Sequence, residues 1–365
     1  MQQQTNQRLR ETKVKDLTAE KRRLVEVPYT ASLSHAMNVF VANKVVAVPV
    51  AAPPGHWIGA GGSMILESDK HTGAVRKHYI GMLTMLDILA HIAGDDQING
   101  GGGVDYGSDI DKKMSVPVSS IIGHCLEGLS LWTLNPNTSI LDCMEVFSKG
   151  IHRALVPTDG QMENISGVEL VESASSYQMV TQMDLLKSLM NHSSDHELDG
   201  ILSHSVKELG AVNETVFAIT DRTKVIDTIK CMKAALLNAV PIVKTSHSLE
   251  EDPKQLINGK SRQLVGTFSA TDLRGCHFAS LQTWLPLTAL EFTETAAAAA
   301  SNTIQSRELI TCHVDSPLSE VINKALTKHV HRVWVVNQGL LAGVVSLTDM
   351  TRVLRVSLLL DPQVI

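Results

Sequence analysis

The sequence predicts an α/β protein (α+β-type repeats) built from four repeats, each made of a helix, two strands and a second helix. The first observation is a pattern that occurs four times, in which an apolar run ends at Ser or Thr and an aspartate follows three residues later. The second is a helix ahead of each copy, with apolar residues at i, i+3, i+4 and i+7. The third is a short apolar strand between that helix and the pattern. Internal repetition of this kind decides the fold before any single motif does.

The last copy of the pattern, Gly343–Asp349, shows its structural logic. Val344 and Val345 are β-branched and suit a buried strand. Ser346 can cap a helix, and Asp349 then falls in the first turn, where the helix dipole favours a negative charge. We call this pattern the Ser/Thr–Asp element. Its copies are residues 81–87, 178–184, 266–272 and 343–349, and the second begins with Gln178 where the others have glycine.

The helix that precedes each element is defined by its apolar face. The four faces are Leu33, Ala36, Met37 and Phe40; Ile140, Cys143, Met144 and Phe147; Val225, Thr228, Ile229 and Met232; and Leu318, Val321, Ile322 and Ala325. The strands that follow these helices are predicted at Val45–Val50, Ala154–Val156, Ala239–Val243 and Val333–Val336. The second helices are predicted at Ile88–Ala93, Leu185–Met190, Leu273 onward and Met350–Leu360.

These elements and the connections between them predict the domain boundaries. Residues 1–15 form a polar, flexible N-terminus, and residues 95–115 form a glycine-rich linker. The repeats occupy residues 16–94, 116–192, 203–282 and 303–360, and residues 283–302 form a second linker. A long insertion at residues 51–78 lies inside the first repeat, and a charged loop at residues 245–262 lies inside the third.

Composition narrows the class of protein. An apolar content of 44% and a charged content of 19% are typical of a globular chain. The net charge of −6 and the 4% aromatic content argue against nucleic-acid binding. The five cysteines are scattered, which suits a reducing compartment, and no apolar run is long enough for a signal peptide or a membrane span. We therefore expect a soluble protein in the cytoplasm, the nucleus or both, without nucleic-acid or membrane partners.

Residues with catalytic chemistry lack a recognisable context. The glycine-rich stretches do not continue into Gly-Lys-Ser/Thr, and no serine lies in Gly-x-Ser-x-Gly. His192 and His196 could share one helix face, but Ser193-Ser194-Asp195 indicates a solvated helix end. We therefore predict no catalytic residue, no catalytic cofactor and no metal site.

Several stretches resemble a known family. These stretches are Tyr79–Thr84, Gly150–Arg153, and Val330–Val333 together with Gly343–Asp349. They are similar to the cystathionine-β-synthase (CBS) repeats of the γ regulatory subunits of AMP-activated protein kinases. The insertion in repeat 1 and the glycine-rich linker resemble the plant γ-like branch. The resemblance implies that repeats 1 and 2, and repeats 3 and 4, pair into two tandem CBS modules that form a flattened disk. Pairing also follows from size, because one repeat is too small to bury its own sheet.

The same resemblance implies a function. It is that of a non-catalytic, energy-sensing regulatory subunit of an AMP-activated or sucrose-non-fermenting-related kinase, which binds AMP, ADP or ATP. Its protein partners would be a catalytic α-type subunit and a β-type scaffold subunit. The alternative is a CBS-repeat adaptor whose nucleotide sites are partly lost and which acts through protein–protein contacts.

The resemblance also implies a division of labour among site residues. Carboxylates would bind ribose, hydroxyl and small polar groups would contact ribose or phosphate, and basic groups would face phosphate. The carboxylates are Asp87, Asp184, Asp272 and Asp349; the polar groups are Thr84, Thr181, Asn238, Ser269, Ser346 and Thr348; the basic groups are His152, Arg153, Lys187, His331 and Arg332. For a single Ser/Thr–Asp element, helix capping without any ligand is the favoured interpretation.

Departures from the family pattern make the four copies unequal. Val46 stands where the family usually has Arg, and Met183 stands where animal members have Lys. Asp184 stands where those members have Arg, and Asn238 occupies the corresponding small polar position in repeat 3. The fourth repeat departs least, so we expect nucleotide binding there first.

Overall fold

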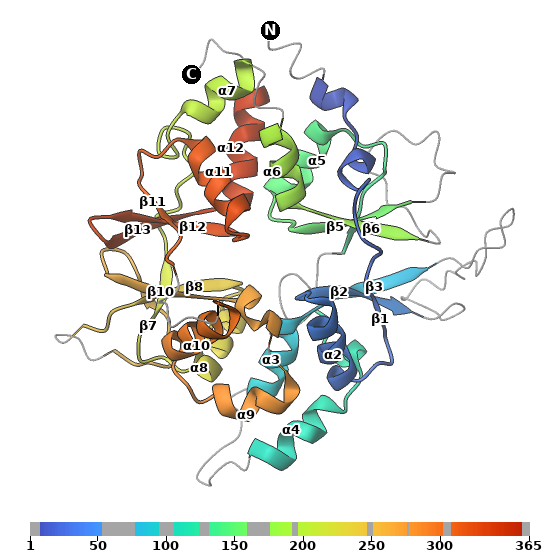
Figure 1. The fold of residues 1–365 in the computed structure, drawn as a ribbon, viewed down its shortest axis with the longest axis vertical. Helices are drawn as coiled ribbons and strands as arrows, with labels where there is room; N and C mark the ends of the chain where they lie inside the picture. Colours follow the sequence, from blue (N-terminus) through green and yellow to red (C-terminus); the bar gives the residue numbers. More distant parts are fainter. Residues whose placement is uncertain are drawn as a thin grey trace, which may run out of the picture.

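The computed structural model describes residues 8–52, 77–94, 106–123, 131–158, 176–191, 196–246, 251–275, 277–301 and 308–359. Four α/β repeats occupy the four quarters of a flat assembly seen along its shortest axis in Figure 1. Helices cover the two ends of the long axis, and the sheets face each other across the middle. The predicted architecture of four repeats in a disk is therefore confirmed.

The repeats share one order of elements: a short strand, a helix, two longer strands, and a helix or helical turn. Repeat 1 contains β1 (Val27–Pro28), α2 (Leu33–Asn43), β2 (Ala47–Ala52), β3 (His78–Thr84) and α3 (Met85–Ala93). Repeat 2 contains β4 (Trp132–Thr133), α5 (Ile140–Ser148), β5 (Arg153–Pro157), β6 (Tyr177–Thr181) and α6 (Gln182–Asn191). Repeat 3 contains β7 (Phe217–Thr220), α8 (Val225–Ala234), β8 (Ala239–Val243), β9 (Ile257–Asn258), β10 (Leu264–Ser269) and the 3₁₀ helix η4 (Ala270–Gly275). Repeat 4 contains β11 (Thr311–Cys312), α11 (Leu318–Thr327), β12 (Arg332–Asn337), β13 (Leu340–Ser346) and α12 (Leu347–Leu359).

Each repeat forms its own small sheet. The first strand pairs in parallel with the second, and the second pairs antiparallel with the third, as in the order β11-β12-β13. Repeat 3 adds β9 antiparallel to β7, which gives the order β10-β8-β7-β9. The parallel pairing follows from the helix between the first two strands, since a parallel connection needs a crossover.

The predicted apolar faces of the first helices are confirmed. The four residues predicted for each of α2, α5, α8 and α11 are all buried. Thr228, the polar member of its set, donates its hydroxyl to the Lys224 carbonyl at 2.9 Å, so its burial leaves no unsatisfied group. Helix periodicity in the sequence was therefore a sufficient guide to the core of every repeat.

The second helix of repeat 3 departs from the prediction. An α-helix was expected from Leu273 onward, but the chain forms η4, then the 3₁₀ turn η5 (Phe278–Ser280) and the short α9 (Leu281–Trp284). The Ser269 hydroxyl lies 2.9 Å from the Thr271 hydroxyl and accepts the Thr271 N–H at 3.3 Å. Because this Ser caps the residue two positions on, the chain starts the tighter 3₁₀ turn.

The segment that precedes each repeat packs against the partner repeat of its module. Val14 N–H donates to Thr138 of repeat 2, whereas Leu33 N–H of repeat 1 donates to Val116, in the segment before repeat 2. In the second module, Leu318 N–H of repeat 4 donates to His204, and Ala289 N–H donates to Thr223 of repeat 3. This exchange ties repeat 1 to repeat 2 and repeat 3 to repeat 4.

The exchange also gives structure to segments predicted to be linkers. Residues 8–11 form a helical turn that η1 (Val14–Leu17) follows, within the N-terminus predicted to be flexible, and Leu9 and Val14 are buried. Two helices lie in the predicted linkers: α4 (Tyr106–Met114) in the first and α10 (Ala289–Ser301) in the second. The 3₁₀ turn η2 (Val118–Ser120) and helix α7 (His196–Ser203) complete these segments. Most of the insertion at 51–78 and the run Gly100–Gly103 lie outside the described residues.

The cores join repeats in two directions. Helices of repeats 2 and 4 share one buried cluster, and helices of repeats 1 and 3 share another. Smaller clusters join the sheets within a module: Tyr79 with Tyr177 in the first, and Val243 with Trp334 in the second. Every repeat therefore packs against its module partner through the sheet and against a repeat of the other module through its helices.

A close approach of two chains explains the glycine at the start of the fourth Ser/Thr–Asp element. A Cβ on Gly343 would lie 2.6 Å from Val212 Cγ1 and 2.9 Å from the Asn213 carbonyl oxygen. Asn213 and Val344 also exchange backbone hydrogen bonds at 2.9 Å. In repeat 2, which lacks the glycine, the Gln178 amide donates to the Lys21 carbonyl at 3.3 Å.

We expect Gly343→Ala to lower the free energy of unfolding by about 1–3 kcal/mol, because the added methyl overpacks this contact. Gly200 lies in helix α7 and would place its Cβ in open space, so Gly200→Ala should be neutral or stabilising by up to about 1 kcal/mol. Denaturant unfolding of both variants measures the difference. Equal stability of the two variants would contradict the close approach.

Candidate functional site

The four Ser/Thr–Asp elements share one hydrogen bond. In each, an aspartate oxygen accepts the backbone N–H of the Ser or Thr three residues earlier, at 2.7–3.0 Å. In repeats 1, 2 and 4 the Thr84, Thr181 or Ser346 hydroxyl donates to the same oxygen. The helix cap expected from the sequence is therefore present in repeats 1, 2 and 4, and repeat 3 keeps the hydrogen bond from the Ser269 N–H to Asp272. The surroundings of each aspartate decide what else it can do.

The aspartates of the first module are engaged by the chain itself. Asp87 is fully buried, so in this arrangement it presents no surface to a ligand. Asp184 accepts the Lys21 ammonium at 2.5 Å on the oxygen that also receives Thr181. Lys21 lies in the segment that passes from repeat 2 to β1, so the exchange described above delivers this cation to the Asp184 carboxylate.

The aspartate of repeat 4 lies in a cavity of about 260 Å³ between repeats 3 and 4. Seven residues selected from the sequence line this cavity: His152, Asn238, His331, Arg332, Ser346, Thr348 and Asp349. One oxygen of Asp349 is held by Ser346, and the other lies 3.5 Å from Arg352, whose side chain is 45% exposed. This is a loose surface contact, so the second carboxylate oxygen remains accessible to a hydrogen-bond donor.

Basic groups from three repeats converge beside the cavity. Arg153 begins β5 and Arg332 begins β12, and His152 and His331 immediately precede these strands. The starts of the two strands lie near each other, because the charge of Arg153 acts on His331. Arg332 donates to the Ala239 carbonyl at 3.1 Å, which fixes its guanidinium between repeats 3 and 4. Arg274, in η4 of repeat 3, adds a further positive charge that acts on Arg153 and His331.

The pKa values of these groups show that they repel one another. Burial, followed by the charges of Arg153, Arg332, His152 and Arg274, lowers the pKa of His331 to about 3. Burial and the Arg332 charge lower the pKa of His152 to about 4. Burial, together with Arg274, lowers the pKa of Arg153 to about 10, and burial does the same for Arg332. The two histidines are therefore neutral near pH 7, while the arginines stay charged in a site that favours an anion.

The element of repeat 3 faces a smaller cavity of about 50 Å³. Ser269 and Thr271 line it together with His331 and Arg332, which also line the larger cavity. Asp272 accepts the Ser269 N–H at 2.8 Å. Lys187 is an exposed residue of α6 and does not line either cavity, so the structure does not bring it to the basic cluster.

Some lining residues were not selected from the sequence. Phe217 and Leu236 line the larger cavity although each is 51% exposed, and Gln182 reaches it from repeat 2. The only signal for Arg274 was its place two residues after Asp272, and nothing in the pattern showed that η4 faces the basic cluster. Among the described residues, no group of three or more His, Cys, Asp or Glu side chains is arranged to hold a metal ion. The described helices also include none that is long and apolar enough to cross a membrane.

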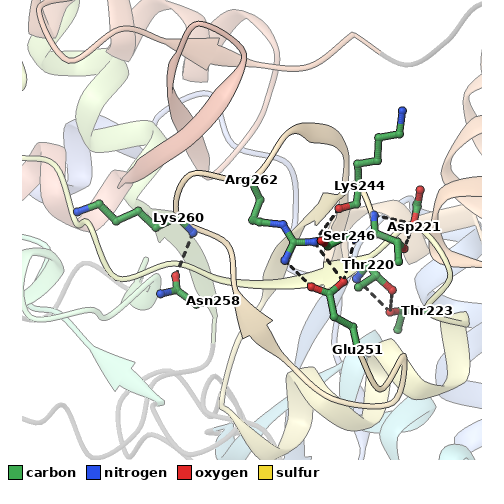
Figure 2. Close-up of polar contacts among 10 residues, drawn as sticks. Thr220, Asp221, Thr223, Lys244, Ser246, Glu251, Asn258, Lys260 and Arg262 are labelled. Atoms are coloured by element: carbon green, nitrogen blue, oxygen red, sulfur yellow. Dashed lines mark hydrogen bonds and ion pairs between the residues drawn. The ribbon is translucent and has the colours of Figure 1, made fainter. Parts of the chain in front are cut away.

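A polar network supports the strand that carries Phe217. Figure 2 shows Arg262 donating to both oxygens of Glu251, at 2.5 and 3.1 Å, and to the Lys244 carbonyl at 2.8 Å. The Glu251 side chain is 7% exposed, so this bidentate pair is shielded from water. It fixes the connection that carries β9, and β9 pairs Asn258 with Phe217.

Comparison with known proteins shows which family this chain belongs to. A family model described as the CBS domain matches residues 301–356, which cover most of repeat 4. The Arabidopsis thaliana SNF1-related protein kinase regulatory subunit gamma-like PV42a is 63% identical over 355 residues, which cover 96% of this chain and 97% of the relative. The chain belongs to this family of gamma-like regulatory subunits. Gamma-like PV42b of the same plant is 59% identical over 98% of each chain. The predicted CBS repeats, the γ family and its plant branch are thus confirmed.

A solved structure supports the fold independently. Protein MJ1225 of Methanocaldococcus jannaschii, proposed to be an archaeal homologue of γ-AMPK, superposes with a TM-score of 0.57. It covers 93% of this chain and 99% of its own, at 18% sequence identity. At that identity the likeness concerns the fold alone, and it extends over all four repeats.

We expect the two central histidines to make stability pH-dependent. In the unfolded chain they titrate near 6.5, and in the folded chain near 4 and 3, so acidification first protonates the unfolded state. Stability should therefore fall from about pH 6.5 downward, by up to about 1.4 kcal/mol per pH unit and histidine. In the double variant His152→Gln/His331→Gln this part of the slope should disappear. Denaturant unfolding between pH 7 and 4 measures it, with His35→Gln on the exposed face of α2 as control, and an unchanged slope in the double variant would refute the expectation.

Proposed function

We propose that this chain is a non-catalytic subunit of an SNF1-related protein kinase complex and that it binds an adenine nucleotide between repeats 3 and 4. Membership of the gamma-like family supports the kinase assignment. The observation that carries the ligand assignment is the pairing, in one cavity, of the Arg332 guanidinium and two imidazoles with an accessible carboxylate. A nucleotide carries both complementary groups, a phosphate and a ribose diol.

The charges account for affinity at both ends of such a ligand. Arg332 and its neighbours are dehydrated and repel one another, so a phosphate would offset a charge that the folded chain already holds at a cost. The Asp349 oxygen that only Arg352 approaches, at 3.5 Å, would accept the ribose hydroxyls. Hydrogen bonds to a charged group contribute about 1.5–3 kcal/mol each. AMP, ADP and ATP share these groups and differ in phosphate charge, which is the property the basic cluster would sense.

The first module has a different task in this proposal. Asp87 is buried and Asp184 is paired with Lys21, so the first module contributes through other groups of repeat 2. His152 lines the cavity and would contact phosphate, and Arg153 would act on it through its charge. A nucleotide would therefore hold the two modules together through charge.

The protein partners follow from the family name. We propose an α-type catalytic kinase subunit and a β-type scaffold subunit, in the cytoplasm, the nucleus or both, with the chain itself without enzymatic activity. A ligand could regulate that complex only by binding two of its states with different affinity.

We expect Asp349→Ala to weaken AMP binding by about 10–100-fold, the loss of one or two hydrogen bonds to a charged group. Asp184→Ala is the matched control, because it removes the same kind of cap at a carboxylate already occupied by Lys21. Calorimetry with AMP measures both. Equal affinity of Asp349→Ala and the wild type would exclude this cavity as the site.

The second candidate function is that of an adaptor that does not respond to nucleotides. The activity of co-purified kinase subunits distinguishes it from the nucleotide-binding function. Purification of the tagged chain from plant extract should recover the catalytic and scaffold subunits, and ATP or AMP should change the activity of the recovered kinase. In Asp349→Ala the subunits should still be recovered but the response to AMP should be lost. Recovery with no effect of either nucleotide on kinase activity in the wild type would favour the adaptor.

A further inference from the structure

Gln182 connects the first module to the ligand cavity of the second. It is the first residue of α6 in repeat 2 and is only 4% exposed. Its side-chain Nε2 donates to the Phe147 carbonyl oxygen at 2.9 Å and to the Thr348 Oγ1 at 2.8 Å. Thr348 lies in the first turn of α12 and lines the cavity between repeats 3 and 4.

The Phe147 carbonyl fixes the direction of this hydrogen bond. A backbone carbonyl can only accept, so the amide atom that faces Phe147 must be the nitrogen. The same nitrogen faces Thr348, so the Thr348 oxygen is the acceptor of that bond. Its hydroxyl hydrogen must then lie away from Gln182, and it is available to an acceptor in the cavity.

The neighbouring hydroxyl has a different role. Ser346 donates its hydroxyl hydrogen to Asp349 at 2.5 Å, so that hydrogen is committed within the protein. Thr348 is thus the hydroxyl of the element that can donate to a ligand, and it lies beside the Arg332 guanidinium and the His331 imidazole in the cavity lining. A donor beside a guanidinium suits a phosphoryl oxygen.

We propose that Gln182 is a positioning residue for the phosphate end of the ligand, acting through Thr348 and linking occupancy of the cavity to repeat 2. This inference rests on the proposed nucleotide site and adds to it a residue that sets which way one hydroxyl points. The link to repeat 2 is direct, because the same nitrogen also holds the last turn of α5, and α12 packs against both α5 and α6.

A double-mutant cycle tests the proposal, with Gln182→Met, Thr348→Val and the combination, using AMP and adenosine as probes. Gln182→Met should weaken AMP binding about 10-fold, the loss of one oriented hydrogen bond to phosphate. In the Thr348→Val background the same change should have an effect within about twofold, because the hydroxyl it orients is gone. Adenosine, which lacks the phosphate, should bind all variants within about twofold of the wild type.

Gln178→Met is the control for removal of a side-chain amide. Gln178 lies in the same repeat but donates to the Lys21 carbonyl, so this variant should leave AMP binding unchanged. Circular dichroism checks that each variant is folded before its affinity is measured. Additive effects of Gln182→Met and Thr348→Val, or an equal loss for adenosine and AMP, would overturn the role of Gln182 while the nucleotide site stands. A wild type that binds neither probe would refute the site and this inference together.

Discussion

One hydrogen bond recurs in every repeat and organises the rest: an aspartate oxygen accepts the N–H of the Ser or Thr three residues before it. It ends the third strand of the sheet and starts the next helix or 3₁₀ turn, with the carboxylate at the positive end of that element. It also uses only one of the two carboxylate oxygens. The function of each repeat then depends on which neighbouring residues contact the rest of its aspartate side chain.

Neighbouring segments give the four aspartates different surroundings. Asp87 is enclosed by the core, and Asp184 receives Lys21 from the segment that crosses between repeats. Asp349 opens onto a cavity that Asn213, in the segment that passes close to Gly343, also lines. Sequence repetition therefore produced a repeated fold, but among the described aspartates of these elements only Asp349 lines the cavity that joins residues of repeats 2, 3 and 4.

Local pattern predicted most of the fold. The apolar periodicity identified all four first helices and their buried residues, since this signal arises from burial within one element. It did not show that the segments before the repeats are exchanged within each module, because that depends on contacts between residues far apart in the chain, such as Val14 with Thr138. The 3₁₀ turn at Ala270–Gly275 was missed because Ser269 caps Thr271, a choice the pattern Ser-x-x-Asp does not reveal. The sequence indicated His331 and Asp349 because both lie in local motifs. It did not indicate Arg274 or Gln182, because their roles arise from packing between repeats.

We propose that the basic residues of repeats 2 and 4 and the carboxylate of Asp349 form one nucleotide site between repeats 3 and 4. A crystal structure of the full chain grown with AMP tests this site. We expect phosphate oxygens within hydrogen-bond distance of Arg332 and the Thr348 hydroxyl, and ribose hydroxyls on Asp349. AMP bound at Asp184 in place of Lys21, with the cavity between repeats 3 and 4 empty, would contradict it.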